Sequence, residues 1–172
     1  IRSDDARALV HEFLLTGGGW LPPEVTATLL RCYEIPLAEL VPVRSQDEAA
    51  AAFAGGGGVP VVLKADVPGL VHKTDAGGVE LGLRTEADVR SACRRLEERF
   101  GEKLRKVLVQ PMIGGGTEVI AGVADDRLFG PLVVFGLGGV ATEVLADHVA
   151  RLTPLTDVDA DMLIRSIRSA PL

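Results

Sequence analysis

A lysine, a histidine and a glycine pair lie close together in the first half of the chain. Lys64 ends the apolar run 61–63, and the loop after it contains His72, Lys73 and the pair Gly77-Gly78. The run predicts a buried strand, and a lysine ending such a strand is costly to bury unless it meets an anion or a carboxylate. Glycines let backbone N–H groups approach phosphate oxygens, and lysines supply positive charge. The combination predicts a triphosphate site.

His72 is the residue that would add chemistry to this site. Neutral imidazole is a competent nucleophile toward a phosphoryl group, and histidine titrates near neutrality. The alternative is an ordinary loop histidine, exposed or packed on the core. For Lys64 the alternative is a lysine whose ammonium reaches solvent past an apolar stem. The adjoining loop favours phosphate contact for Lys64, whereas Lys73 equally suits a solvated loop.

A second candidate nucleotide contact follows the strand predicted over 106–110. Gln110, Pro111 and Met112 stand where the sequence pattern changes. Adenine needs an apolar slot together with backbone donors and acceptors, and methionine supplies a compliant apolar surface. The same residues equally suit a strand end that packs on the core.

The second half of the chain contains one acidic and one glycine-rich candidate. Glu118 lies on the strand predicted over 117–123, where a solvent-facing carboxylate is an equally good interpretation. Residues 136–139 are predicted to form a tight loop. Its Gly138 and Gly139 precede a helix predicted from about 141, and Glu143 lies just inside that helix. Such a turn can bind phosphate at the helix N-terminus, or can simply allow close packing. Glu143 could orient a histidine or attract magnesium.

The elements that must position these residues alternate between strands and helices. Strands are predicted over 40–43, 60–65, 78–83, 106–110, 117–123 and 132–135, and helices over 3–15, 22–33, 46–54, 86–100, from about 141 and from 158. Ser45 and Thr85 are predicted helix caps, because their side chains can accept N–H bonds from the first turn. The other histidines, His11 and His148, lie on helical patterns. The fold class is therefore α/β or α+β, with two lobes meeting near residues 110–113.

Composition restricts the partners. The net charge of −6 and the acidic pI argue against nucleic acid and anionic membrane as partners, so any anion site must be local. Cys32 and Cys93 lack metal-type spacing, which favours reduced thiols and a cytoplasmic location. No metal cluster is predicted, because Asp157, Asp159 and Asp161 are typical of a helix start. The beginning at Ile1 and an end directly after a helical pattern predict a piece of a longer protein.

With these motifs in view, the chain resembles the ATP-grasp domain of NDP-forming (ADP-forming) acyl-CoA synthetases. The resemblance includes the related region of bacterial protein acetyltransferases fused to a GNAT domain. The matching stretches are Leu30–Pro36, Pro60–Gly78, Val109–Met112, Gly115–Val123, Phe129–Pro131 and Phe135–Glu143. The motif from His72 to Asp75, followed by Gly77-Gly78, is specific to this family rather than to ATP-grasp proteins at large.

The resemblance implies an ATP-grasp fold with a nucleotide cleft between two lobes. Residues 1–20 would be a helical lead-in, 21–112 the first lobe, and 113–172 a second lobe that is incomplete at its C-terminus. The implied cofactors are ATP or ADP and Mg²⁺, with magnesium ligands beyond the end of this chain. In the family, Gln110 and Met112 correspond to the adenine hinge, and Glu118 is placed near the nucleotide or the phosphohistidine.

The implied reaction is acyl-CoA + ADP + phosphate ⇌ acid + CoA + ATP, through phosphohistidine at His72. Its implied partners are CoA-binding and CoA-ligase domains of the same or a partner chain, so this chain alone is expected to be inactive. The alternative function is a regulatory module of a GNAT protein acetyltransferase that senses nucleotide or acyl-CoA without turnover. A carboxylate–amine ligase of the wider ATP-grasp class is a third possibility, against which the His72 motif argues.

Two positions depart from the family pattern. Glu34 stands where the family usually has glycine, which changes a turn. Asp125 and Arg127 alter the usual "RDPxFGP" segment that ends here at Phe129, Gly130 and Pro131.

Overall fold

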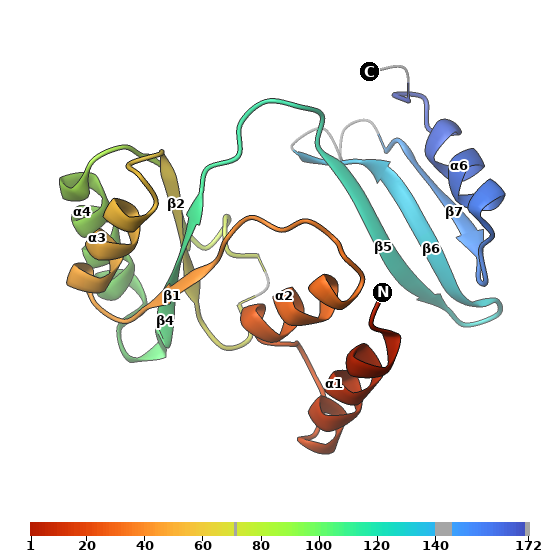
Figure 1. Cartoon of the computed structure of the whole chain (residues 1–172), viewed down its shortest axis with the longest axis horizontal. Helices are drawn as coiled ribbons and strands as arrows, with labels where there is room; N and C mark the ends of the chain where they lie inside the picture. Colours follow the sequence, from red (N-terminus) through yellow and green to blue (C-terminus); the bar gives the residue numbers. More distant parts are fainter. Residues whose placement is uncertain (71, 140–145, 171–172) are drawn as a thin grey trace. The chain divides into compact units, whose positions relative to one another are not determined.

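The computed structural model describes residues 1–70, 72–139 and 146–170. The chain divides into two compact units, Ile1–Ile113 and Gly114–Leu172, each with its own sheet (Figure 1). The mixed α/β class predicted from the sequence is confirmed.

Unit 1 is built on a four-stranded antiparallel sheet with the order β1-β4-β2-β3. Its strands are β1 (Val41–Val43), β2 (Val61–Asp66), β3 (Val79–Leu83) and β4 (Lys106–Pro111). Helices α3 (Gln46–Gly55) and α4 (Glu86–Phe100) cover one face of this sheet (Figure 1). The short 3-10 helix η1 (Gly101–Lys103) joins α4 to β4.

Alternation along β2 decides which side chains meet these helices. Val61, Leu63 and Ala65 are almost fully buried in the core, together with Val89 and Leu96 of α4. Because successive strand residues point to opposite faces, Lys64 lies on the face of the sheet away from α3 and α4. Every second residue of β2 therefore packs in the core, and Lys64 lies on the opposite face of the sheet.

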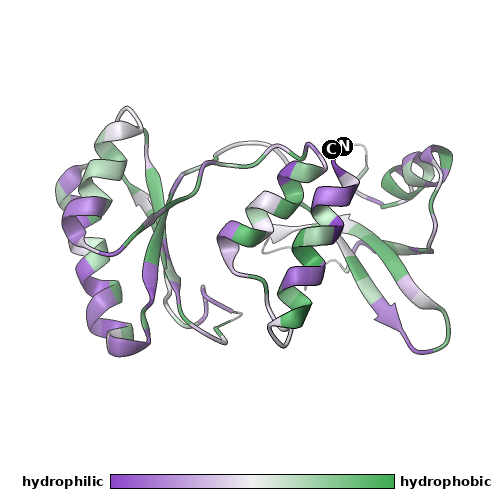
Figure 2. Ribbon diagram, turned by 60° about the horizontal axis from the view of Figure 1, so that its bottom comes forward, coloured by the Kyte–Doolittle hydropathy of each residue, from purple (hydrophilic) through white to green (hydrophobic). Residues whose placement is uncertain are grey.

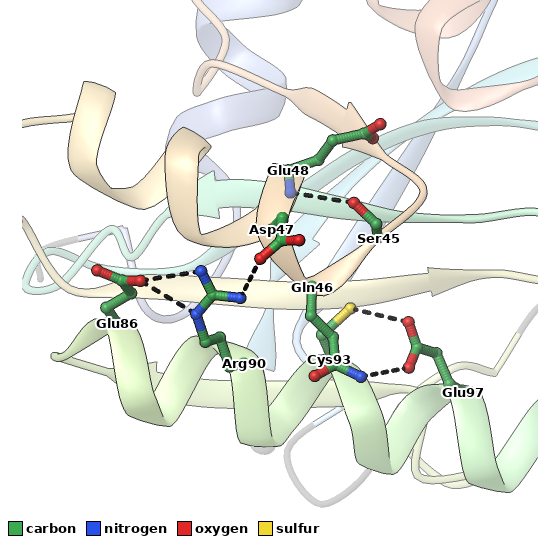
Figure 3. A network of polar contacts seen from close by, with 8 residues as sticks. All are labelled: Ser45, Gln46, Asp47, Glu48, Glu86, Arg90, Cys93 and Glu97. Carbon is green, nitrogen blue, oxygen red and sulfur yellow. Dashed lines mark hydrogen bonds and ion pairs between the residues drawn. The ribbon is translucent and has the colours of Figure 1, made fainter.

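Polar contacts fix α3 and α4 side by side on the sheet (Figure 3). Arg90 binds the carboxylates of Asp47 and Glu86, and the amide of Gln46 donates to Glu97 over 2.8 Å. The predicted cap Thr85 is confirmed, since its hydroxyl accepts the N–H of Asp88 in a reciprocal capping box. The predicted cap Ser45 is confirmed as well, because it accepts the N–H of Glu48. Helix α4 is mostly hydrophilic, whereas α3 is rich in alanine (Figure 2).

Two helices precede the sheet in the sequence, α1 (Ser3–Leu15) and α2 (Pro23–Cys32). Helix α2 lies on the side of the sheet opposite to α3 and α4 (Figure 1). The ammonium of Lys106 on β4 binds Glu24 of α2 and lies 3.6 Å from Asp66 of β2. This ion group attaches α2 to the sheet. No helix in the described part of the chain is long and apolar enough to cross a membrane.

Unit 2 contains a three-stranded antiparallel sheet with the order β5-β6-β7 and the helix α6 against β6 and β7. Its elements are β5 (Val119–Asp126), β6 (Gly130–Leu137), β7 (His148–Leu152) and α6 (Asp157–Arg165). The carboxylate of Asp147 accepts the N–H groups of Arg168 and Ser169, both over 2.8 Å. Asp147 therefore joins the residues after α6 to the start of β7.

Two predictions for unit 2 are wrong. Gly136 and Leu137 were predicted to form a loop, but they extend β6, where Gly136 pairs with His148. His148 itself was expected on a helix and instead begins β7. The alanine-containing stretch favours helix locally, and pairing with β6 overrides that preference. The helix predicted from about 141, including Glu143, lies outside the described residues.

Candidate functional site

The face of the unit 1 sheet away from α3 and α4 brings together two of the predicted site residues. In the β2–β4 pairing Val62 lies opposite Gln110 and Lys64 lies opposite Leu108. Lys64 and Gln110 are therefore diagonal neighbours on one face, a relation that places two residues about 7–8 Å apart. Met112, just past the end of β4, is held by its N–H to the carbonyl of Pro60 over 2.8 Å and is exposed. A nucleotide could lie along this face from the Met112 end toward Lys64.

The electrostatics around Lys64 favour an anion. Its side chain is partly buried, and this burial lowers the pKa of its ammonium below the ordinary value. The charge of Lys73 lowers the same pKa further. Within the described residues neither lysine has a carboxylate within 4 Å. A phosphate bound between them would compensate two positive charges that now repel each other.

The loop between β2 and β3 closes through its own backbone hydrogen bonds. The N–H of Gly77 donates to Thr74 over 2.9 Å, and that of Gly78 donates to Lys73 over 2.6 Å. The carbonyl of Gly78 accepts the N–H of Ala65 over 2.8 Å. In this conformation both glycine N–H groups are engaged inside the loop, so phosphate binding by them requires the loop to rearrange. Their nucleotide-binding role stays a prediction.

His72 lies on the surface of this loop. Its side chain is exposed, and its carbonyl accepts the N–H of Ala76 over 3.3 Å. Its imidazole has no hydrogen-bond partner in the part of the chain that the structure describes. A ring nitrogen without a partner retains the lone pair that a phosphoryl acceptor needs.

Arg99 is a residue near the loop that the sequence analysis missed. It lies in the last turn of α4, and its guanidinium contacts the carbonyl of Ala76 over 3.5 Å. A Cβ added to Gly77 would lie 2.4 Å from the Arg99 Nη1. Glycine at position 77 therefore leaves space for the Arg99 side chain and also allows the backbone conformation of the turn. No sequence pattern connects positions this far apart, so only the fold could reveal this contact.

In unit 2 the structure brings together Glu118, Gly138 and Gly139. The N–H of Gly138 donates to the carbonyl of Glu118 over 2.8 Å. Gly139 has φ +68°, and a Cβ there would lie 2.4 Å from a carboxylate oxygen of Glu118. The predicted glycine turn and the predicted acidic residue thus form one group. Among the described residues no three histidine, cysteine, aspartate or glutamate side chains gather as metal ligands.

Comparison with known families agrees with these observations. A family model described as "ATP-grasp domain" matches residues 12–172. The chain is 38% identical over 172 residues to the β subunit of the ADP-forming acetate–CoA ligase I of Pyrococcus furiosus, covering 97% of this chain and 73% of that subunit. It is 40% identical over 144 residues to the ADP-forming acetate–CoA ligase II of Archaeoglobus fulgidus, covering 84% of this chain and 21% of that enzyme.

A solved structure gives the same result for the fold. The chain matches an acetyl-coenzyme A synthetase 1 of Ca. Korarchaeum cryptofilum, described as dinucleotide forming, in complex with coenzyme A, Ca-AMPCP and HgCl⁺. The TM-score is 0.85 at 34% identity, with 96% of this chain and 74% of that chain covered. The chain therefore belongs to the ATP-grasp family and is an ATP-grasp module of the ADP-forming acyl-CoA synthetase type.

Proposed function

We propose that this chain binds ADP or ATP with Mg²⁺ and serves an enzyme that interconverts acyl-CoA, ADP and phosphate with acid, CoA and ATP. The observation that carries the proposal is the position of Lys64. Its partly buried side chain lies on the face of the sheet away from α3 and α4, without a carboxylate partner among the described residues and next to the loop of His72. Such a charge is stable where a phosphate compensates it.

His72 is the proposed phosphoryl carrier. A ring nitrogen attacks the phosphorus of an incoming phosphoryl group, and a P–N bond forms as the bond to the donor breaks. A β-phosphate oxygen of ADP then attacks the same phosphorus, and the P–N bond breaks with its electron pair returning to the imidazole. Lys64 and Lys73 offset negative charge on the transferred group. Since one residue must meet a donor and ADP, the loop that carries His72 has to move.

The remaining site residues have proposed binding roles. Gln110 and Met112 would contact adenine, and Glu118 with Gly138 and Gly139 would face the phosphates or the phosphohistidine. Mg²⁺ in proteins is bound by one or two carboxylates plus substrate phosphates, and it supplies charge neutralisation.

The CoA-binding and CoA-ligase functions are proposed to lie on other domains of the same or a partner chain. This chain spans 73% of a β subunit and 21% of a longer relative, and both relatives are ligases. Their names support the ligase function over the regulatory acetyltransferase alternative. Residues 21–112 and 113–172 are the proposed lobes. The two free cysteines support a cytoplasmic location.

Calorimetric titration of the chain with Mg·ADP tests the nucleotide site. Lys64→Ala should weaken binding about 10- to 100-fold, because a hydrogen bond to a charged group contributes about 1.5–3 kcal/mol. Lys103→Ala, which removes an exposed lysine of η1, should leave the affinity unchanged. Equal affinities of wild type and Lys64→Ala would remove Lys64 from the site.

The phosphoryl carrier is tested in the full-length protein with its partner domains. His72→Ala should abolish ATP formation from acyl-CoA, ADP and phosphate while nucleotide affinity stays within about twofold of wild type. An undiminished turnover of this variant would refute the carrier role. A wild-type protein that binds ADP but turns over no acyl-CoA would favour the regulatory alternative.

A further inference from the structure

Unit 1 contains a cavity of about 280 Å³ that the proposed nucleotide face does not include. It lies between the start of α2 and the end of β2. Its walls include Trp20, Pro22, Pro68, Leu70, Lys73 and Arg105. At roughly 30 Å³ for each water, the volume equals about nine waters, which is room for one ring with a short side chain. Among the proposed nucleotide contacts that the structure describes, Lys73 alone lines it, whereas Lys64, His72, Gln110 and Met112 do not.

The cavity lies at the far end of β2 from the proposed adenine contacts. Val61 pairs with Pro111 at one end of the strand, whereas Asp66, which borders the cavity, pairs with Lys106 at the other. Five residue steps along an antiparallel strand span about 17 Å. A ligand in the cavity and an adenine near Met112 would therefore occupy different places.

One wall is apolar. Trp20 is 79% exposed, and it is the only tryptophan of the chain. An exposed indole gains by being covered, and it prefers flat rings that stack on its face or meet its edge. Pro22 and Pro68 each have a φ fixed by the ring, which reduces the conformational freedom of the backbone beside this wall.

The other wall has an excess of positive charge. Among the described residues Lys73 donates only to the carbonyl of Leu70, over 3.4 Å, and Arg105 is exposed. Neither has a carboxylate within 4 Å among residues 1–70, 72–139 and 146–170. The carboxylate in the lining, Asp66, is already near the ammonium of Lys106, 3.6 Å away. Two cations without acidic partners are notable in a chain whose net charge is −6.

We infer that this cavity binds a small aromatic carboxylate. The ring would pack on the indole of Trp20, and the carboxylate would lie between Lys73 and Arg105. The planar guanidinium of Arg105 can donate two parallel hydrogen bonds to a carboxylate, a geometry that a single ammonium cannot match. Binding would restrain Lys73 and Leu70, which belong to the loop of His72. The effect on the His72 loop rests on the proposed function, whereas the binding of the carboxylate in the cavity does not.

Tryptophan fluorescence of the 172-residue chain measures the binding directly, since Trp20 is the single reporter. Phenylacetate should change the emission along a saturable curve. Benzyl alcohol, which has the ring without the charge, and acetate, which has the charge without the ring, should bind at least tenfold more weakly. Inorganic phosphate serves as a plain anion, and binding as tight as that of phenylacetate would overturn the aromatic specificity.

Variants locate the site. Arg105→Ala and Lys73→Ala should each weaken phenylacetate binding about tenfold, while Lys103→Ala should have no effect. Trp20→Phe, followed by calorimetry, should retain binding because the ring contact is retained. An unchanged affinity in Arg105→Ala, with the same far-ultraviolet circular dichroism as wild type, would overturn the proposal.

Competition separates this cavity from the nucleotide site. Saturating ADP should weaken phenylacetate binding no more than Lys73→Ala does, because Lys73 is the one described residue that both sites use and Arg105 with Trp20 stays available. Complete displacement of phenylacetate by ADP would show that the cavity is the far end of the nucleotide site, and it would overturn the proposal of a separate site. Binding of phenylacetate by a chain that shows no affinity for ADP would support the cavity while counting against the proposed function.

Discussion

Gly77 lies directly beneath the guanidinium of Arg99, at a spacing that leaves no room for a Cβ. A Cβ at position 77 would lie 2.4 Å from Nη1 and 2.7 Å from Cζ, and Gly77 has φ +67°. Two separate causes therefore favour glycine here: a left-handed backbone and the close approach of the arginine. The first is fixed by the turn, whereas the second involves the far end of a flexible side chain.

Gly77→Ala should lower the free energy of unfolding by about 1–2 kcal/mol, which is the usual cost of a left-handed residue with a Cβ. Gly57→Ala is the matched control, because Gly57 has φ +73° with nothing within 4 Å of its Cβ position. Chemical denaturation should give similar losses for both variants, since Arg99 can move aside. A much larger loss in Gly77→Ala that Arg99→Ala restores would show that the contact, rather than the backbone, dominates.

The pH dependence of nucleotide affinity reports the interaction of Lys64 with Lys73. Burial and the charge of Lys73 lower the pKa of Lys64 in the free chain. Phosphate binds the charged form, so affinity for ADP should fall as pH rises through this lowered pKa, earlier than for an ordinary lysine. Lys73→Met removes the repulsion and should move the decline to higher pH. Calorimetry at a series of alkaline pH values measures both curves, and superimposable declines would contradict the coupling.

The lowered pKa of Lys64 affects folding stability in the direction opposite to its effect on nucleotide affinity. The unfolded chain keeps the ordinary pKa of lysine, so between the two pKa values it binds more protons than the folded chain. Stability contributed by Lys64 therefore rises with pH across this window. Lys64→Met should flatten that rise.

Cys93 should be inert toward thiol reagents in the native chain. Burial, followed by the charge and hydrogen bond of Glu97, raises the pKa of its thiol to about 12. The thiolate, which is the reactive form, is then about 10⁻⁴ of the total at pH 8. Glu97→Gln should leave the native thiol unreactive, because burial is the larger cause. Labelling with a thiol reagent before and after denaturation measures this, and rapid labelling of native wild type would contradict it.

The sequence predicted the local features of the site better than its long-range contacts. The apolar run 61–63 was enough to predict the strand that carries Lys64, although β2 continues past Lys64 to Asp66. The capping residues Ser45 and Thr85 were predictable because capping acts within one turn. The contact of Arg99 with Gly77 and the binding of Glu24 by Lys106 join residues far apart in the sequence, so no local pattern encodes them. His148 was misplaced for a related reason, since pairing with β6 decides its conformation.

The glycine pair shows the limit of motif interpretation in another way. Glycine next to a lysine-containing loop predicts N–H groups free for phosphate. In the structure these N–H groups donate to the carbonyls of Thr74 and Lys73 inside the loop. A motif states which backbone conformations are allowed, and it does not state which one the free chain adopts.

Glu34→Gly should stabilise the chain. Glu34 has φ +60°, a conformation that costs a residue with a Cβ about 1–2 kcal/mol and costs glycine little. Glycine also gains entropy in the unfolded state, so we expect a net rise in the free energy of unfolding of about 0.5–1 kcal/mol. Its ion pair with the N-terminal ammonium, 3.0 Å long, is exposed and contributes little.

Two control variants separate the causes in the Glu34 experiment. Glu34→Gln removes the ion pair but keeps the backbone strain, so its stability should stay near that of wild type. Glu39→Gly introduces glycine in the same irregular segment at a residue without positive φ, and should lower stability through unfolded-state entropy alone. Urea denaturation of the four chains measures the differences. A Glu34→Gly chain less stable than wild type, alongside an unchanged Glu34→Gln chain, would show that the left-handed turn at position 34 is not under strain.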